Sequence, residues 1–185
     1  MKRFALVIIA GMAACAAPNA AMADALQPVN EIMTVALLAW SDNPPEDTDY
    51  FSDARLAGNY SAAFVAAYRA AQKFPAYEME AGETAGYPFD YDVITNSQDG
   101  CPLKDIKAEA LPENAGVTAV KVTFRLWDCA EDEAQRKEIN ELRFEVINED
   151  GKPVISDIKH TADGEVQSLM SDMLEIAKGV GQGEQ

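Results

Sequence analysis

Two cysteines bracket the segment that most constrains how this chain can fold. Cys101 and Cys129 flank two stretches in which apolar and polar side chains alternate, Leu103–Leu111 and Val117–Trp127. Such alternation is typical of a β-strand with one buried face. Between them lies Asn114-Ala115-Gly116, and a three-residue hairpin loop favours glycine in its last place, where the backbone is left-handed. The sequence therefore predicts an antiparallel hairpin.

The turn sets a register in which the two strands match in hydropathy and in charge. On the apolar face the predicted pairs are Ile106–Phe124, Ala108–Val122 and Ala110–Val120. On the polar face they are Asp105–Arg125 and Glu109–Lys121. A shift by two residues would place Lys107 against Lys121, so charge favours the same register. Cys101 then lies opposite Cys129, which predicts a disulfide between them.

Met1–Ala23 has the features of a secretory signal peptide. Two basic residues precede the apolar stretch Phe4–Ala14, and Ala21-Met22-Ala23 has the small-x-small pattern that signal peptidase cuts. The apolar stretch is too short to span a bilayer comfortably. We therefore expect a periplasmic or secreted protein that begins at Asp24 and has no transmembrane segment after cleavage.

Cys15 offers an alternative to simple cleavage. Met12-Ala13-Ala14-Cys15 resembles a bacterial lipoprotein box, so lipidation at Cys15 would instead place the domain on the outer membrane. If cleavage after Ala23 removes Cys15, two cysteines remain in the mature chain. An even number of cysteines in an oxidising compartment favours a structural disulfide. A redox-active pair is disfavoured because the two are not in a Cys-x-x-Cys arrangement.

The chain is strongly acidic. It has 15 Lys and Arg residues against 31 Asp and Glu residues, a net charge of −16, and the loss of two basic residues with Met1–Ala23 makes this −18. Nucleic acid and anionic membrane are disfavoured as partners, since phosphate neutralisation needs basic clusters and the sequence has none. The charge serves either solubility or the binding of a cationic ligand or basic protein.

Asp24–Lys178 has the length of one domain, and Gly179–Gln185 is predicted to be a flexible tail.

Two amphipathic helices are predicted in the N-terminal half. Apolar side chains recur at helical spacing in Pro28–Trp40, and Ser41-Asp42-Asn43-Pro44-Pro45 ends the helix because neither proline can continue it. A second helix is predicted over Ser52–Phe74, with Ser52 or Asp53 as its cap. The acidic loop between them lacks the EF-hand spacing, so no calcium site is predicted.

The C-terminal half is predicted to continue as strands and to end in a helix. Glu138–Ile147 and Pro153–His160 alternate, and Glu149-Asp150-Gly151 repeats the turn chemistry of the first hairpin. The resulting pairs are Val146–Val154, Leu142–Ile158, Arg143–Asp157 and Glu141–Lys159. Asp163–Lys178 has the helical period. The fold class is therefore α+β: two N-terminal helices, a four-stranded antiparallel meander and a C-terminal helix.

A polar loop before the first strand is the first candidate binding site. In Phe89–Asp99, aromatic side chains alternate with polar ones and are followed by consecutive amides, hydroxyls and carboxylates. Long loops in compact domains are often functional. The candidate ligand- or partner-binding residues are Asp90, Asp92, Asn96, Gln98 and Asp99. The alternative is that these side chains only close Asx turns and hold the loop shut.

Three polar residues on the apolar face of the sheet are the second candidate site. They are Asn140, Ser156 and His160, and the proposed register sets Asn140 opposite His160. His160 is the single histidine, which makes it the natural acid–base candidate or, alternatively, a hydrogen-bonded structural residue. One histidine and two bridged cysteines are too few for a zinc set, and neither a nucleophile triad nor a phosphate loop is present. No catalytic residue, cofactor or metal is predicted.

Four short motifs resemble a family of exported bacterial proteins. They are Tyr50-Phe51-Ser52, Asp92-Val93-Ile94-Thr95-Asn96-Ser97-Gln98-Asp99, Val154-Ile155-Ser156-Asp157-Ile158 and Ser168-Leu169. Their order is similar to that in the domain of unknown function 3828 family. The resemblance implies a cone fold like that of nuclear transport factor two or cystatin. It carries over no catalytic residues, and because some members resemble envelope lipoproteins, it implies a protein partner.

Three functions fit these observations. The leading one is an exported, non-enzymatic binding or protein-interaction module of the bacterial cell envelope. The second is a small-ligand-binding protein or acid–base enzyme that uses the pocket of the cone. The third is an acidic inhibitor or immunity-type protein that blocks a basic partner. The sequence leaves enzymatic activity undecided and disfavours it.

Overall fold

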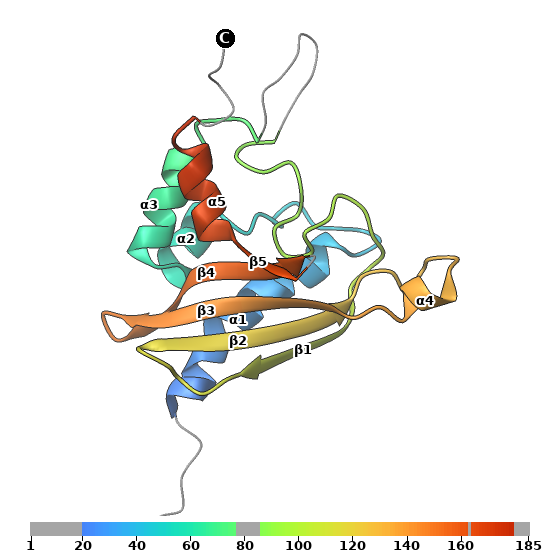
Figure 1. The fold of residues 1–185 in the computed structure, drawn as a ribbon, viewed down its shortest axis with the longest axis horizontal. Helices are drawn as coiled ribbons and strands as arrows, with labels where there is room; N and C mark the ends of the chain where they lie inside the picture. Colours follow the sequence, from blue (N-terminus) through green and yellow to red (C-terminus); the bar gives the residue numbers. More distant parts are fainter. Residues whose placement is uncertain (1–19, 77–85, 163, 180–185) are drawn as a thin grey trace, which may run out of the picture.

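A five-stranded antiparallel sheet organises the fold. The computed structural model describes residues 20–76, 86–162 and 164–179. The strands follow each other in space in the order β1-β2-β3-β4-β5, so the sheet is a meander (Figure 1). They are β1 Lys104–Ala110, β2 Val117–Arg125, β3 Asn140–Glu149, β4 Lys152–Ala162 and β5 Glu165–Ser168. The α+β class is confirmed, and the sheet has one strand more than predicted.

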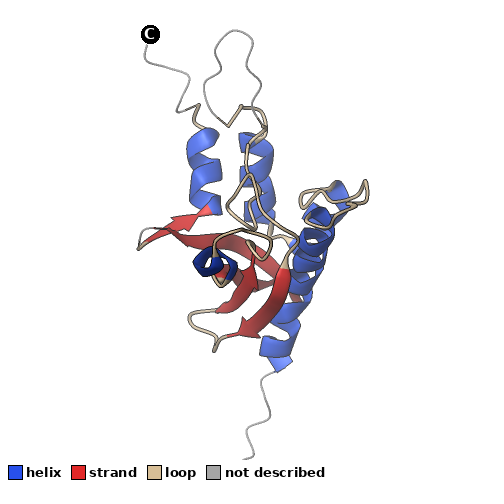
Figure 2. Cartoon of the chain, turned by 90° about the vertical axis from the view of Figure 1, so that its right-hand side faces the viewer, coloured by secondary structure: helices blue, strands red, loops and turns tan. Residues whose placement is uncertain are grey.

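The helices lie on one face of this sheet, beside its strand β4 and, in the connection between β2 and β3, beyond the strand ends (Figure 1). They are α1 Ala20–Ala39, α2 Asp53–Asn59, α3 Ala62–Ala71, α4 Glu133–Arg136 and α5 Leu169–Ile176. The longest, α1, runs across the sheet, whereas α3 and α5 lie side by side next to β4 (Figures 1 and 2). Among the described residues, no helix is both long and apolar enough to cross a membrane.

The core lies between α1 and the sheet. Along β2 every second side chain is buried, as the alternation predicts. The large side chains that are almost fully buried come from α1, α3, the sheet and the loop before β1, and include Ile32, Phe64, Ile94, Phe124, Leu142, Phe144, Ile155 and Ile158. Burying one such side chain contributes about 1.5–3 kcal/mol, so this shared interface holds the layers together.

The first hairpin has the predicted register near its turn and a bulge at its far end. Ala108 pairs with Val122 and Ala110 with Val120. The turn is tighter than predicted, because Ala115 and Gly116 both have positive φ and form a two-residue turn. At the other end Lys104, not Asp105, pairs with Arg125, because Asp105 and Ile106 together oppose Phe124. Arg125 Nε still lies 2.7 Å from Asp105 Oδ2.

The predicted register of the second hairpin is wrong. Leu142 pairs with His160, and Phe144 with Ile158, so Asn140 does not lie opposite His160. One cause is the turn: Asp150 and Gly151 both have positive φ, and this two-residue Asp-Gly turn closes the hairpin at the pair Glu149–Lys152. The other cause is a bulge at Ser156, which shifts the pairing by one further residue. As a result Arg143 lies opposite Lys159 and Glu145 opposite Asp157, and Lys159 Nζ forms an ion pair with Glu145.

The predicted second helix is interrupted. Tyr60 is extended, with φ −118°, and forms an isolated parallel bridge with Ile155 of β4. Ser61 N donates to Ile155 O at 2.9 Å. The Ser61 hydroxyl then caps α3, since its oxygen accepts from Phe64 N at 3.2 Å. Contact with β4 therefore divides Ser52–Phe74 into α2 and α3.

The predicted last helix begins later than expected. Glu165–Ser168 pairs with β4 as the edge strand β5, so α5 begins at Leu169. Ser168 acts as the cap, with its side-chain oxygen accepting from Ser171 N at 3.1 Å. The buried Asp157 holds this junction, since it accepts from Ser168 Oγ at 2.7 Å and from Met170 N at 3.0 Å. The predicted cap, Asp163, lies outside the described residues.

The predicted disulfide is confirmed. Cys101 and Cys129 are bonded, with their Cα atoms 5.8 Å apart, and join the segment before β1 to the segment after β2. Cys101 is buried and Cys129 is exposed.

The predictions for residues 1–19 and 180–185, including most of the signal peptide, Cys15 and most of the tail, lie outside the described residues.

Candidate functional site

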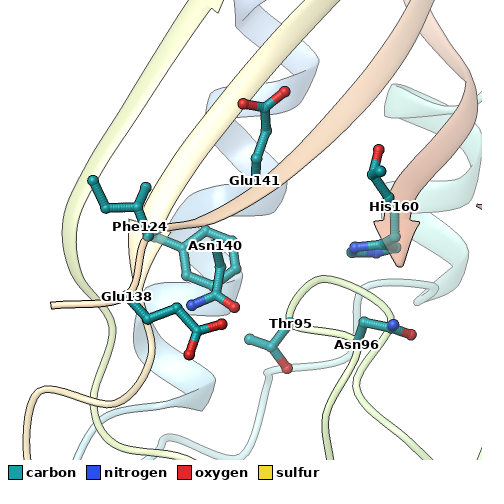
Figure 3. A pocket seen from close by; sticks show the side chains of 9 residues that line it. Thr95, Asn96, Phe124, Glu138, Asn140, Glu141 and His160 are labelled. Carbon is teal, nitrogen blue, oxygen red and sulfur yellow. The ribbon is translucent and has the colours of Figure 1, made fainter. Parts of the chain in front are cut away.

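A pocket of 480 Å³ lies where β2, β3 and β4 meet the loop before β1 (Figure 3). Residues at the ends of β2, β3 and β4 form one wall of the pocket, and Thr95 and Asn96 of the loop form the facing wall. The lining residues are Thr95, Asn96, Phe124, Glu138, Ile139, Asn140, Glu141, His160 and Thr161. Most of them are polar, which suits a ligand that forms hydrogen bonds.

Asp92 shapes the loop wall. Its Oδ1 accepts from the backbone N–H groups of Ile94 and Thr95, at 2.9 and 2.8 Å. Its Oδ2 accepts from the Trp40 indole at 3.0 Å and from the Tyr50 hydroxyl at 2.7 Å. This carboxylate and burial together raise the pKa of Tyr50. Because both oxygens of Asp92 are engaged within the chain, the side chain acts as the centre of an Asx turn and not as a ligand-binding group.

The rest of the loop also bonds mainly to itself. Gln98 Nε2 donates to Asp90 O at 3.1 Å and to Asp90 Oδ2 at 3.3 Å. Ser97 Oγ donates to Asp99 O at 2.7 Å. Asp90, Asn96, Gln98 and Asp99 are exposed, and of the five candidates in this loop only Asn96 lines the pocket. The contacts favour the alternative in which most of these side chains hold the loop shut.

His160 fastens the loop to the sheet. Its Nε2 lies 2.8 Å from Val93 O, so in the neutral tautomer that carries hydrogen on Nε2 the ring donates to this carbonyl. Burial lowers the pKa of His160 below 6.5, and the Val93 carbonyl and the carboxylates of Asp92 and Asp172 oppose that shift. The imidazole is therefore predominantly neutral at pH 7, with Nδ1 as its remaining acceptor.

Asn140 lines the pocket, with the oxygen of its amide group on the side of Thr95 (Figure 3). It is the first residue of β3 and pairs with Phe124 of β2. Its Nδ2 is buried and has no hydrogen-bond partner among the described residues. Ser156, the third candidate on this face, does not line the pocket. Its hydroxyl donates to Glu145 O at 3.2 Å beside the β4 bulge.

Two pocket residues were missed by the sequence analysis. Glu138 is exposed and forms no ion pair within the described ranges, and Ile139 is 67% exposed although it is a large apolar residue. The sequence could have predicted the exposure of Ile139. The alternation that buries Leu142 and Phe144 places Ile139 on the opposite face, toward solvent. Figure 3 shows the Glu138 side chain and the amide oxygen of Asn140 directed toward Thr95, whereas the Asn140 nitrogen and the Glu141 side chain are directed away.

Charged residues on the outer face of the sheet alternate in sign. Arg125 contacts Asp105 at 2.7 Å, Arg143 Nη2 lies 3.7 Å from Glu141, and Lys159 contacts Glu145. Neighbouring charges therefore neutralise each other on this face. In the ranges that the structure describes, no three His, Cys, Asp or Glu residues are grouped so that they could hold a metal ion.

The chain was compared with protein-family models, curated proteins and solved structures, and nothing matches it significantly. The resemblance to the domain of unknown function 3828 family therefore stays a prediction.

Proposed function

We propose that this protein is an exported, non-enzymatic binding module of the bacterial cell envelope, which holds its ligand or partner in the pocket between residues 92–97 and the ends of β3 and β4. The observation that carries the proposal is the polar pocket of 480 Å³, whose lining includes Thr95, Asn96, Glu138, Asn140 and Thr161. Ligand sites place a few polar groups where they can orient a ligand by hydrogen bonds, and this lining offers such groups.

The surroundings of His160 support binding over acid–base catalysis. A general base must reach the proton that it removes and needs a suitable pKa. One nitrogen of His160 is engaged by Val93 O. The carboxylates that act on the ring, those of Asp92 and Asp172, are not among the residues that line the pocket. His160 is thus arranged to fasten the loop.

The paired charges of the outer sheet face argue against the acidic inhibitor. A protein that blocks a basic partner needs a contiguous group of free carboxylates. On this face Asp105, Glu141 and Glu145 each have a cationic neighbour within the chain. The excess negative charge of the protein thus does not gather there.

Export is the second part of the proposal. The signal-like Met1–Ala23 and the Cys101–Cys129 disulfide support an oxidising compartment. The first described side chain of α1 that is buried is Ala25, so cleavage before Asp24 would leave the described core contacts of α1 in place. The resemblance to the domain of unknown function 3828 family supports the envelope and a protein partner.

The export proposal is tested by the intact mass of protein recovered from the periplasm. We expect a chain that begins at Asp24. A diacylated amino terminus at Cys15 would identify a lipoprotein instead, and a chain that retains Met1 in the cytoplasm would contradict export.

The binding proposal is tested by recovery of partners or ligands from envelope extracts on the immobilised protein. Asn140→Leu replaces a polar residue of the pocket lining by an apolar one of similar size, and Ser156→Ala is the matched control because Ser156 lies outside the pocket. Wild type and Ser156→Ala should retain the same molecule, and Asn140→Leu should lose it without a fall in melting temperature. Retention by Asn140→Leu would show that the pocket is not the binding site.

A further inference from the structure

We propose that strand β1, at the open edge of the sheet, pairs with β1 of a second copy of the chain and so forms a two-fold symmetric dimer. This surface is separate from the pocket, because no residue of β1 lines it. Among the described residues, β1 is the terminal strand of the sheet and pairs with β2 alone. Figure 1 shows β1 along the lower edge of the sheet, with no strand beyond it.

The backbone of β1 leaves hydrogen-bonding groups at this edge. Leu111 N donates to Ala119 O at 2.8 Å, next to the end of β1. Backbone groups alternate in direction along a strand, so every second residue counted back from Leu111 faces β2 and the residues between them face away. The N–H and C=O groups of Ala108 and Ala110 therefore lie at the open edge, together with the Ile106 carbonyl. Within the described ranges, no backbone hydrogen bond outside the strand ladder involves these three residues.

Charge selects one register for the second copy. Three antiparallel two-fold registers match the edge groups and keep most of residues 106–110 paired, and they centre on Lys107, Ala108 or Glu109. A centre at Lys107 or at Glu109 sets two like charges directly opposite each other, which is destabilising. With the centre at Ala108, Lys107 lies opposite Glu109 of the second copy, and the symmetry repeats this pair. The second copy is therefore complementary in charge in this register alone.

The side chains of this segment suit the same register. Lys107 is exposed and forms no ion pair among the described residues, and the exposed Glu109 has its Oε2 4.0 Å from Lys121 Nζ. Both can therefore reach an opposite charge on a second copy. On the other face Ile106 and Ala110 are half-buried and pack against the core. They lie opposite each other across the dimer edge, so the apolar layer continues from one copy into the next.

The features that protect a sheet edge lie at the ends of this segment. Monomeric proteins protect their edge strands with bulges, prolines and lysines. Here the bulge is at Asp105, which has a φ of 52–54° like the other left-handed residues of the chain, and Pro112 follows the strand. Between them the pairing with β2 is continuous over residues 107–110. Because so short a segment forms a small interface, we expect a weak dimer with a Kd of about 1–100 μM.

The dimer is tested by sedimentation velocity of the purified protein over a range of about 1 μM to 1 mM, where we expect a concentration-dependent dimer. Lys107→Glu and Glu109→Lys each set like charges opposite each other and should each weaken the dimer about tenfold or more. The double variant Lys107→Glu/Glu109→Lys restores opposite charges and should restore the dimer. The control Lys73→Glu makes the same charge change at an exposed residue outside β1 and should change the Kd less than about twofold.

Amide hydrogen exchange, followed by NMR, tests which groups pair. The amides of Ala108 and Ala110 should exchange more slowly at high protein concentration than at low concentration, because the second copy accepts their hydrogen bonds. The amides of Lys107 and Glu109 face β2 in the single chain, so their exchange should depend less on concentration. This alternation distinguishes pairing at the edge of β1 from contact at another surface.

Three results would overturn the proposal. One is a monomer at every concentration, and another is a dimer that Lys107→Glu leaves unchanged, which would place the interface elsewhere. The third is a double variant that keeps the melting temperature of the wild type but does not dimerise, because charge pairing across the edge would then not set the register. None of these results bears on the pocket, so the proposed binding function is tested separately.

Discussion

A single carboxylate, Asp92, connects three segments that are distant in the sequence. It joins its own turn to Trp40, at the end of α1, and to Tyr50, before α2. This turn places Thr95 and Asn96 in the wall of the pocket. A residue that the sequence suggested as a ligand-binding group thus has a structural role, and the pocket depends on it indirectly.

Asp92→Asn should lower the free energy of unfolding by about 1–3 kcal/mol. Asparagine can keep the bonds to Ile94 N and Thr95 N, but its NH₂ group would then face the Trp40 indole, which can only donate. Urea unfolding measures the loss. The control is Asp99→Asn, an exposed position that should change stability by less than about 0.5 kcal/mol. Equal stability of Asp92→Asn and wild type would contradict the role of Asp92 in the loop.

His160 should make the fold less stable in mild acid. Burial lowers its pKa in the folded protein below 6.5, so the unfolded chain binds a proton first as the pH falls. The contribution is fully present above pH 6.5 and is lost as the pH decreases from there toward the folded pKa. Asp172, whose pKa is raised by burial and by Asp157, acts in the opposite sense at lower pH.

The measurement is the melting temperature of wild type and His160→Gln between pH 8 and pH 5. Glutamine can still donate to Val93 O but does not titrate, so the wild type should lose more stability than the variant over this range. Since His160 is the single histidine, the difference between the two curves reports that group. Parallel curves would show that the ring is not buried as described.

At the scale of the elements, contact with β4 decides where the helices break. Ser61 N donates to Ile155 O, and the Ser61 hydroxyl restarts the helix as the cap of α3. The sequence pattern of Ser52–Phe74 suits one continuous helix, since its apolar spacing hardly changes at the break. Helical propensity is a weak preference, and here a buried backbone hydrogen bond to the sheet overrides it.

Ser61→Ala should cost about 0.5–2 kcal/mol in stability, with a loss of helical signal by circular dichroism. The matched control is Ser52→Ala. Ser52 is the cap residue of α2 but makes no capping hydrogen bond, so its replacement should cost less than about 0.5 kcal/mol. If both variants lose equal stability, the hydroxyl of Ser61 does not act as a specific cap.

At the scale of the whole molecule, the disulfide closes the base of the first hairpin beside the candidate site. Replacing both Cys101 and Cys129 by serine should lower the free energy of unfolding by about 3–4 kcal/mol, because the bridge closes a loop with a sequence separation of 28. Urea unfolding gives the difference. In protein from the periplasm, thiol blocking without reduction should label neither cysteine, and alkylation of both would contradict the bridge.

The sequence by itself determined the features that depend on neighbours along the chain. Alternation with a period of two indicated the first four strands, and their short connections predicted the meander. The expected three-residue turn Asn114-Ala115-Gly116, together with charge pairing, predicted the register from Ala108 to Ala110 and the bridge, although the turn itself has two residues. The second register was wrong at the turn for a local reason, because an Asp-Gly pair favours the two-residue type.

Only the tertiary structure decided the bulges, the helix break, the fifth strand and the pocket. The bulge at Ser156 adds one residue to the shift that begins at the turn, so His160 lies opposite Leu142 and not opposite Asn140. The pocket formed because Val93 O reaches His160 and the Asp92 carboxylate reaches Trp40, residues that are 67 and 52 positions apart. A sequence pattern reports which face of an element is apolar, but not which distant polar groups will satisfy one another once the layers are packed.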